Sequence, residues 1–349
     1  MNKSYIEIHK EKLEPGMKLA QDIETKFGAT LLSKNSILTA DEIKKLYNLD
    51  QKYFKIVNQN QSEQKDNLYK IMNVKVEYQK KIKQYKELFN CLKNNDTLDK
   101  KEVEKLTKET IGLANNMEVT DVLNIVRDTD EYTYSHLLNV GLHANFFAEW
   151  LDLSEKEKGE LTTAGILHDI GKMKIPNEIL KKPGELNDEE YEIIKTHSRE
   201  SYNIVKKADF ISEKTRAGIL THHEQYNGKG YPLGLKGKEI PYYGRILAII
   251  DAFDAITSDK IYNPASSPFE AMRIFKEDKN QFYDYELKEI FLLNMPNIFV
   301  QEKVRLNDGR VAEIKFINPD QPDKPIISLD GKIINLKNYD ELYIDKIVR

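Results

Sequence analysis

Between Glu118 and about Leu293, apolar residues recur at helical spacing almost without interruption. This periodicity predicts a large, mainly helical domain. The same stretch contains three polar segments: ILHDIGK at 166–172, a lone His197, and HHEQYNGKGYP at 222–232. Neutral imidazoles and carboxylates are ligands that first-row transition metals prefer. Adjacent ligand residues on one helical turn cannot all point at one ion, so these segments predict ions held between helices.

Two further histidines, His136 and His143, lie on a predicted helix whose apolar side includes Leu137, Val140, Ala144, Phe147 and Leu151. Both should face inward, where an unpaired imidazole is costly. His136 is a candidate metal ligand because the histidines of the other segments need partners from neighbouring helices. No comparable reason makes His143 a metal ligand, so it is assigned to the core.

His168 and Asp169 end an apolar helix just before Gly171. Lys172 lies one turn beyond His168, so the two side chains share a face if the helix continues that far. The alternative for Lys172 is a solvated cation favoured by the helix dipole. His197, taken alone, would be interpreted as a core histidine.

Asp251 lies in RILAIIDAFDAI at 245–256, where nearly every neighbour is apolar. A carboxylate there is costly unless it is paired or binds a metal. We favour a metal ligand over a buried ion pair for Asp251. Asp254, one turn further on, could cap, hydrogen-bond or support a ligand.

The pattern changes along the chain, from short strands around Gly28 to long helices and finally to hairpins. Asp-Gly between apolar runs, at Asp308-Gly309 and Asp330-Gly331, is a strong hairpin signal. The fold class is therefore mainly α, with small additions at both ends. In chain order we predict a small α/β module at 1–58, a polar linker and long helices at 59–116, the helical domain at 117–295 and a β-hairpin module at 296–349.

Residues 68–93 form a predicted long helix with an apolar stripe at Ile71, Val74, Tyr78, Ile82, Tyr85, Phe89 and Leu92. The stripe steps by three or four residues, which is close to a heptad seam. One interpretation is a helix packed on the next domain. The other is a helix that forms a homodimer.

Composition excludes several classes of protein. A net charge of −4 argues against a dedicated DNA-binding protein, which would need a basic face. Cys91 is the only cysteine, so disulfides within the chain and a thiolate cluster are excluded. Because there is no run of about 18 apolar residues and the start of the chain is polar, we expect a cytoplasmic protein that does not enter the membrane.

Taken together, ILHDIGK, His197, HHEQYNGKGYP and RILAIIDAFDAITSDKIY resemble the HD-GYP subgroup of the HD phosphohydrolase superfamily. DEYTYSHLLNV at 130–140 resembles the segment that carries that family's first metal histidine. The similarity covers roughly residues 117–295, with the motifs in the expected order and spacing.

The resemblance implies an all-helical catalytic domain that hydrolyses cyclic di-GMP to linear pGpG, and sometimes on to GMP. It implies divalent metal ions, usually iron or manganese, with Asp169 bridging them and Lys172 holding the scissile phosphate. The loop at Gly230, Tyr231 and Pro232, together with Lys260, would contact the nucleotide. The implied metal ligands are His136, His168, Asp169, His197, His222, His223 and Asp251.

Three departures from the family pattern qualify these expectations. Family members with a third metal carry a glutamate where this chain has Tyr132, so we predict two ions. Lys260 replaces an arginine and Asn263 a basic residue, which should weaken contacts to phosphate and guanine. Asn227 stands where aspartate is common, and we expect a mild effect.

The expected mechanism is attack on phosphorus by a hydroxide held between two ions. Two alternatives remain open. The chain could be a receptor that binds a cyclic dinucleotide without turnover, because Lys260 and Asn263 depart from the family. It could also hydrolyse another cyclic dinucleotide, such as cyclic GMP-AMP.

Overall fold

The computed structural model describes residues 5–13, 17, 19–24, 30–32, 36, 38, 40–47, 49, 51–57, 76–92, 97–117, 132–258 and 266–348. The chain forms two compact units, Met1–Asn73 and Val74–Arg349. The sequence Thr39-Ala40-Asp41-Glu42 is typical of a capping box, but Thr39 lies outside the described residues. Lys260 and Asn263 of the predicted substrate site also lie outside them.

The first unit is the predicted small α/β module. Strand β1 (Tyr5–His9) pairs antiparallel with β4 (Tyr53–Val57), and β2 (Ile23–Glu24) pairs with β3 (Thr30–Leu32). Helix α1 (Ala40–Tyr47) places Ile43 and Leu46 in a core with Leu19 and Phe54, as its apolar spacing predicts. A single turn, η1 (Lys10–Lys12), follows β1.

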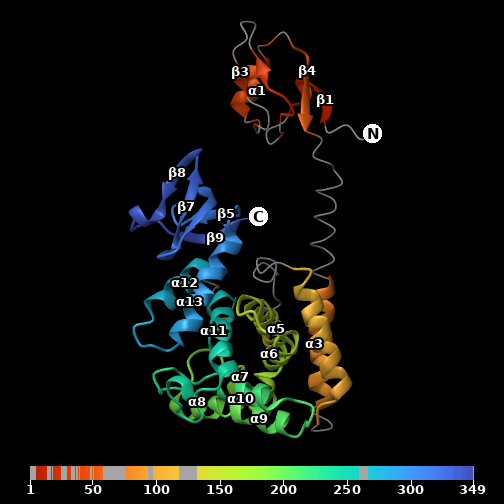
Figure 1. The fold of residues 1–349 in the computed structure, drawn as a ribbon, viewed down its shortest axis with the longest axis vertical. Coiled ribbons are helices and arrows are strands. Elements are labelled where there is room, and N and C mark those ends of the chain that lie inside the picture. Colours follow the sequence, from red (N-terminus) through yellow and green to blue (C-terminus); the bar gives the residue numbers. More distant parts are fainter. Residues whose placement is uncertain are drawn as a thin grey trace. The chain divides into compact units, whose positions relative to one another are not determined.

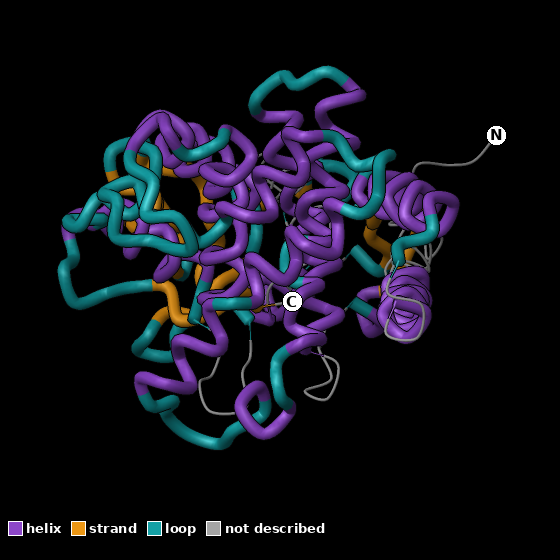
Figure 2. The backbone as a smooth tube through the Cα atoms, turned by 90° about the horizontal axis from the view of Figure 1, so that it is seen from below, coloured by secondary structure: helices purple, strands orange, loops and turns teal. Residues whose placement is uncertain are grey.

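The second unit is dominated by helices, which confirms the predicted fold class (Figures 1 and 2). Among the described residues, no helix combines the length and the apolarity needed to cross a bilayer. After a helix at 76–92 come α3 (Lys100–Ala114), α5 (Tyr132–Trp150), α6 (Glu155–Leu167), η3 (Ile170–Lys174), α7 (Asn177–Leu180), α8 (Asp188–Lys195), α9 (His197–Lys206), α10 (Glu213–Thr221), η4 (Gly237–Glu239), α11 (Tyr242–Thr257), α12 (Pro268–Glu277), α13 (Tyr285–Asn294) and η5 (Met295–Phe299).

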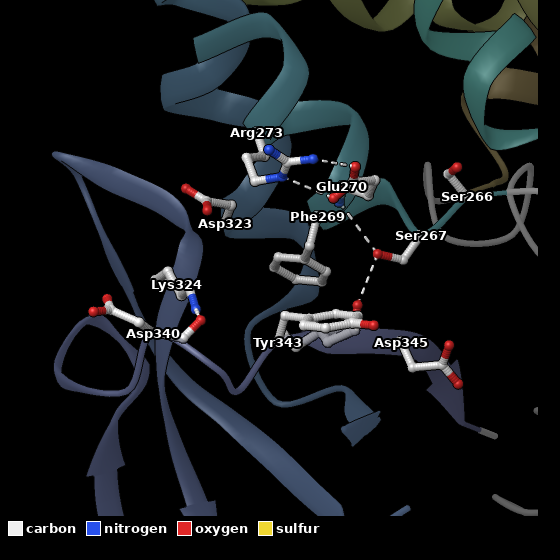
Figure 3. Close-up of a pocket in the computed structure, with 11 residues that line it drawn as sticks. Ser266, Ser267, Phe269, Glu270, Arg273, Asp323, Lys324, Asp340, Tyr343 and Asp345 are labelled. Carbon is white, nitrogen blue, oxygen red and sulfur yellow. Dashed lines mark hydrogen bonds and ion pairs between the residues drawn. The ribbon is translucent and has the colours of Figure 1, made fainter. Parts of the chain in front are cut away.

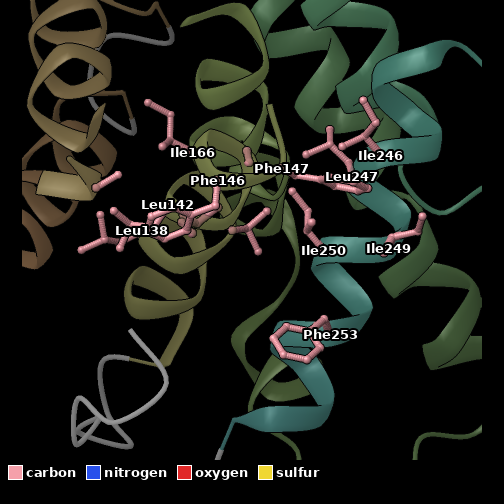
Figure 4. Close-up of a cluster of buried hydrophobic side chains, with 14 of the residues drawn as sticks. Leu138, Leu142, Phe146, Phe147, Ile166, Ile246, Leu247, Ile249, Ile250 and Phe253 are labelled. Atoms are coloured by element: carbon pink, nitrogen blue, oxygen red, sulfur yellow. The ribbon is translucent and has the colours of Figure 1, made fainter. Parts of the chain in front are cut away.

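Helices α5 and α11 run through the centre of the helical core. In α5 every residue from 135 to 148 is buried, as expected for a helix that is surrounded on all sides. Its Leu138, Leu142 and Phe147 lie in the same apolar cluster as Ile250 and Phe253 of α11 (Figure 4). This packing fixes the two helices that carry His136 and Asp251.

The apolar stripe of the helix at 76–92 is buried within the second unit, where Tyr78, Ile82 and Tyr85 belong to the main core. The Tyr78 hydroxyl donates a 2.8 Å hydrogen bond to Asn139 Oδ1 on α5. These contacts favour the first of the two interpretations of this helix, packing on the next domain.

The C-terminal strands form one antiparallel sheet in the order β8-β7-β6-β5-β9, which confirms the predicted hairpins. Gly309 (φ 89°) and Gly331 (φ 78°) occupy the left-handed conformation that tight hairpin turns require. The strands are β5 (Lys303–Leu306), β6 (Val311–Asn318), β7 (Gln321–Leu329), β8 (Lys332–Asn335) and β9 (Ile344–Val348), with a short turn η6 (Leu336–Asn338) between the last two.

The sheet packs against α12, where a cavity of about 560 Å³ lies between them (Figure 3). Ser267 caps α12 by accepting from the Glu270 N–H and donates to Ile344 O at 2.9 Å. The sequence Ser267-Pro268-Phe269-Glu270 is typical of a capping box, but the Glu270 carboxylate instead accepts from the Arg273 guanidinium at 2.9 Å.

Candidate metal centre

The predicted ligands converge at one place in the helical core. His136 comes from α5, and Asp251 from α11. The other five lie at helix ends: His168 and Asp169 after α6, His197 at the start of α9, and His222 and His223 after α10. Their ligand atoms fall into two groups, each within 4.8 Å: Asp169, His197, His222 and His223 in one, and His136, His168 and Asp251 in the other.

Asp169 lies between the two groups. Its Oδ1 is 3.1 Å from His197 Nε2 and 3.8 Å from His222 Nε2. Its Oδ2 is 3.3 Å from His168 Nε2 and 3.5 Å from His136 Nε2. Each oxygen therefore faces a different group of histidines, which is the arrangement needed for a carboxylate that bridges two ions.

Asp251 also spans both groups. Its Oδ1 is 3.0 Å from His136 Nε2 and 3.6 Å from His168 Nε2. Its Oδ2 is 3.9 Å from His223 Nδ1. The centre thus contains two carboxylates and five imidazoles, an oxygen and nitrogen donor set suited to iron, manganese or zinc.

The outer nitrogens of these histidines fix the orientation of the rings. Nδ1 of His168, His197 and His222 each donates to the carbonyl oxygen three residues earlier, at 2.7, 2.6 and 2.6 Å. His136 Nδ1 lies 2.7 Å from Asp254 Oδ2. With Nδ1 engaged, the neutral imidazole turns the lone pair of Nε2 toward the centre, as in metal sites.

The arrangement fits cations in the centre. His197 Nε2 and His222 Nε2 lie 3.3 Å apart, although both present lone pairs when their Nδ1 atoms donate. His168 Nε2 and Asp169 Oδ1 are buried and have no hydrogen-bond partner within the part of the chain that the structure describes. A divalent ion in each group would satisfy these atoms, since buried polar groups otherwise cost free energy.

The pKa shifts of His222, His223 and Asp169 agree with this interpretation. Burial lowers the pKa of His222 well below its usual value and that of His223 to about 3, so both are neutral and able to bind metal. Burial would raise the pKa of Asp169, but Lys172 and nearby histidines hold it well below the usual range. His168 is the exception: burial is outweighed by Asp169 and Asp251, which raise its pKa to about 9, so a metal ion at its Nε2 would displace a proton.

The segment after α6 differs from the sequence expectation. The α-helix ends at Leu167 and the chain continues as the tight turn η3, so Lys172 does not continue the α6 face that ends at His168. The Lys172 ammonium instead contacts Asp169 Oδ2. Gly171 permits this turn, because a Cβ there would lie 2.2 Å from His197 O.

The predicted substrate loop borders the centre. The Tyr231 ring lies 4.8 Å from the His223 ring, centroid to centroid. A Cβ on Gly230 would lie 2.2 Å from Gln225 N, so the loop folds back tightly on the residues after α10. Pro232 O accepts from Arg199 Nη2 at 2.8 Å. Gly230, Tyr231 and Pro232 are therefore held beside the predicted ligands.

Sequence reasoning missed Glu224. This buried carboxylate accepts from the backbone N–H groups of Leu233 and Gly234 through Oε1, at 2.6 and 3.1 Å, and of Leu235 through Oε2, at 3.0 Å. It therefore closes the loop that carries Tyr231. The signal was present, since a carboxylate beside a glycine-rich segment can satisfy several loop N–H groups.

The structure assigns two other polar residues clearly. Asp254 is buried and hydrogen-bonded to His136, the second of the roles weighed for it. His143 is buried with its ring packed edge-on against Phe253 at 5.5 Å, consistent with a place in the core.

Comparison with known proteins agrees with the fold and the motifs. Residues 121–287 match the HD domain family. A solved structure of an HDGYP protein from Bdellovibrio bacteriovorus superposes with a TM-score of 0.51 over 82% of this chain and 97% of that one. Its sequence is 16% identical, so this likeness concerns the fold alone.

Curated relatives match about half of the chain. A cyclic di-GMP phosphodiesterase from Thermotoga maritima is 40% identical over 177 residues, covering 50% of this chain and 48% of the relative. A cyclic di-GMP phosphodiesterase from Pseudomonas aeruginosa is 35% identical, and the match covers 55% of this chain and 47% of the relative. A 3′3′-cGAMP-specific phosphodiesterase from Vibrio cholerae is 31% identical, and the match covers 54% of this chain and 37% of the relative.

The chain thus spans about half or less of the length of these curated relatives. The seven candidate ligands, from His136 to Asp251, all lie within the residues that match the HD domain family. The helical core thus matches the HD domain family over residues 121–287, as the resemblance noted in the sequence predicts.

Proposed function

We propose that this protein is a metal-dependent phosphodiesterase that hydrolyses cyclic di-GMP to linear pGpG. The observation that carries the proposal is Asp169, whose two oxygens face two separate histidine groups 3.1 to 3.8 Å away. The names of the Thermotoga and Pseudomonas relatives support the substrate. Further cleavage of pGpG to GMP would be a second step of the same chemistry.

Two divalent ions, iron or manganese, would be held by the seven side chains of the centre. His197, His222 and His223 would bind one ion, His136, His168 and Asp251 the other, and Asp169 would bridge them. When bound, such ions activate water and neutralise phosphate charge. The predicted count of two rests on these two groups and on Tyr132, whose side chain lies outside the description.

The chain's own residues would bind and orient the diester. Lys172 holds its ammonium at Asp169, at the edge of the centre, where it can neutralise charge on a phosphate oxygen. Tyr231, beside His223, and the loop fixed by Glu224 would border a bound nucleotide. Lys260 stays a predicted contact from the sequence.

Hydrolysis of cyclic GMP-AMP is a second candidate, favoured by the Vibrio cholerae relatives named for that substrate. The same centre would cleave either diester, because the scissile phosphate is chemically equivalent in both. Only contacts to the bases would separate the two substrates, so rates on both belong in the test.

The test is hydrolysis of cyclic di-GMP and cyclic GMP-AMP by protein loaded anaerobically with Mn²⁺ or Fe²⁺, with product identification. We expect linear pGpG from wild type and a loss of at least about 10³-fold in rate for Asp169→Ala, since a bridging ligand is removed. His143→Gln, a buried histidine outside the two ligand groups, is the control. Equal inactivity of wild type and Asp169→Ala with either metal would reject the proposal.

Other expectations remain predictions. We propose a cytoplasmic protein that does not bind DNA, with the helical domain at 117–295 catalytic and the end modules regulatory. A homodimer through residues 68–93 would need a contact surface other than the stripe from Tyr78 to Leu92, because that stripe is buried in the second unit. Light scattering of the full chain tests this prediction.

A further inference from the structure

A row of side chains leads away from the metal centre. The Tyr231 ring lies 4.8 Å from the His223 ring, and Lys195 Nζ lies 5.9 Å from the Tyr231 centroid. Lys195 Nζ is also 5.1 Å from the centroid of Tyr191. The ammonium therefore lies between two aromatic rings, one of which contacts a histidine of the centre.

The backbone fixes this row to the centre. Helix α8 ends at Lys195, and α9 begins at His197. His197 Nδ1 donates to Ile194 O at 2.6 Å, so the turn that orients this histidine also sets the start of the Lys195 side chain. Lys195 and the ligand group thus share one rigid segment.

The row is open to a ligand. Tyr191 is 49% exposed, whereas the Lys195 side chain is only 24% exposed and rests against the rings. Lys195 also contacts Glu192, but that carboxylate is 70% exposed, and ion pairs in water contribute little. A phosphate can therefore replace Glu192 at the ammonium, while an exposed ring can stack on a base.

We propose that Lys195, Tyr191 and Tyr231 form a subsite for the part of a cyclic dinucleotide that is not cleaved, with Lys195 binding its second phosphate. This inference rests on the proposed function. A cyclic dinucleotide carries two phosphodiesters, and when one is at the ions the other must lie to one side of the centre. The rings of His223, Tyr231 and Tyr191 form a row, and the Lys195 ammonium lies near the last two. This arrangement suits a phosphate that is flanked by two bases, with the phosphate at the ammonium and the bases at the rings.

Lys195→Gln tests the subsite in the full-length, Mn²⁺-loaded protein. We expect KM for cyclic di-GMP to rise about tenfold with kcat nearly unchanged, because a charge-assisted contact to bound substrate is lost. Activity on bis(p-nitrophenyl) phosphate, which has one phosphate, should not change. Lys195→Arg should keep most of the affinity, and Tyr191→Ala should raise KM for cyclic di-GMP alone.

The matched control is Lys206→Gln, which removes an exposed lysine whose Nζ lies 5.8 Å from the Tyr202 centroid on α9. It should change neither substrate's kinetics. An unchanged KM for cyclic di-GMP in Lys195→Gln, or an equal loss on both substrates, overturns the subsite.

Failure of the proposed function gives a different result. If wild type hydrolyses neither cyclic dinucleotide, calorimetric binding of cyclic di-GMP to the Mn²⁺-loaded protein decides the inference. Binding weakened about tenfold by Lys195→Gln supports the subsite without turnover. Equal binding by both proteins, or none by wild type, overturns it.

Discussion

Among single residues, Asp254 shows how the centre depends on side chains that do not face it. Its carboxylate lies 2.7 Å from His136 Nδ1, and the Ser258 hydroxyl donates to the same oxygen at 3.1 Å. Asp254 therefore holds the His136 ring with Nε2 toward Asp251 and Asp169. Such outer partners orient a ligand and raise its basicity.

For Asp254→Asn we expect metal affinity to fall about 10- to 100-fold, with activity restored by excess metal. The amide keeps the shape but loses the charge that stabilises the ring orientation. Metal titration followed by calorimetry and by activity measures both effects. Asp169→Asn is the contrasting variant, which excess metal should not restore. Unchanged affinity in Asp254→Asn would show that Asp254 has no part in holding the ligand.

The buried histidines predict how acid affects the metal-free protein. Because the pKa of His223 is lowered from 6.5 to about 3, the folded state binds fewer protons than the unfolded state below pH 6.5. The contribution of His223 to stability is therefore full above pH 6.5 and falls as pH decreases toward 3. His168 acts in the opposite sense, but between pH 6.5 and 9, outside this window.

Between pH 6.5 and 5, the free energy of unfolding of the metal-free protein should fall by about 1 kcal/mol through His223. This value is smaller than the full pKa shift would give, because the His223 side chain is 26% exposed and solvent screens part of the effect. Urea denaturation at several pH values measures the slope, and His223→Gln should reduce it. A slope that is the same in both proteins would contradict this assignment.

At the scale of elements, helix ends rather than helix faces build most of the centre. His168 and His222 are the C-cap residues of α6 and α10, and His197 begins α9. Each bonds the last turn of a preceding helix through Nδ1, so ring orientation is set by backbone carbonyls. The loop after α10 is held in a similar way by Glu224.

Glu224→Ala should destabilise the protein by about 2 to 3 kcal/mol, because three loop N–H groups lose a buried, charged acceptor. The loop from Gly228 to Leu235 should also become more sensitive to proteases. Thermal unfolding and limited proteolysis measure these effects. Glu239→Ala is the control, since Glu239 accepts a single N–H, from Lys236 at 3.1 Å, in an exposed turn. Equal effects of the two substitutions would contradict a special role for Glu224.

At the scale of the whole molecule, the two ends of the chain differ. The first unit has its own core, built from Leu19, Leu46 and Phe54. The C-terminal sheet instead shares the main core, in which Val304 and Ile344 cluster with residues of α5 and α11. The predicted module at 296–349 is thus a sheet that completes the helical domain's packing.

A chain beginning at Val74 should therefore keep metal binding and phosphodiesterase activity within about threefold, because every residue of the centre lies in the second unit. A chain ending at Val300 should unfold or aggregate, since it exposes the apolar side chains that the sheet covers. Circular dichroism, metal content and activity test both. A folded, active protein without the sheet would contradict the shared core.

The sequence alone determined which residues form the helices, the hairpins and the set of candidate ligands, because periodicity and turn chemistry are local. It also identified the family, since the motifs keep their order and spacing. It could not determine that α6 gives way to a tight turn at Asp169, that Glu270 binds Arg273, or that Glu224 closes the loop. These outcomes depend on which atoms meet after folding, even though the partners are only three to eleven residues apart in the chain. Only the tertiary structure decided that Asp169 faces both histidine groups and that Lys195 lies between two rings.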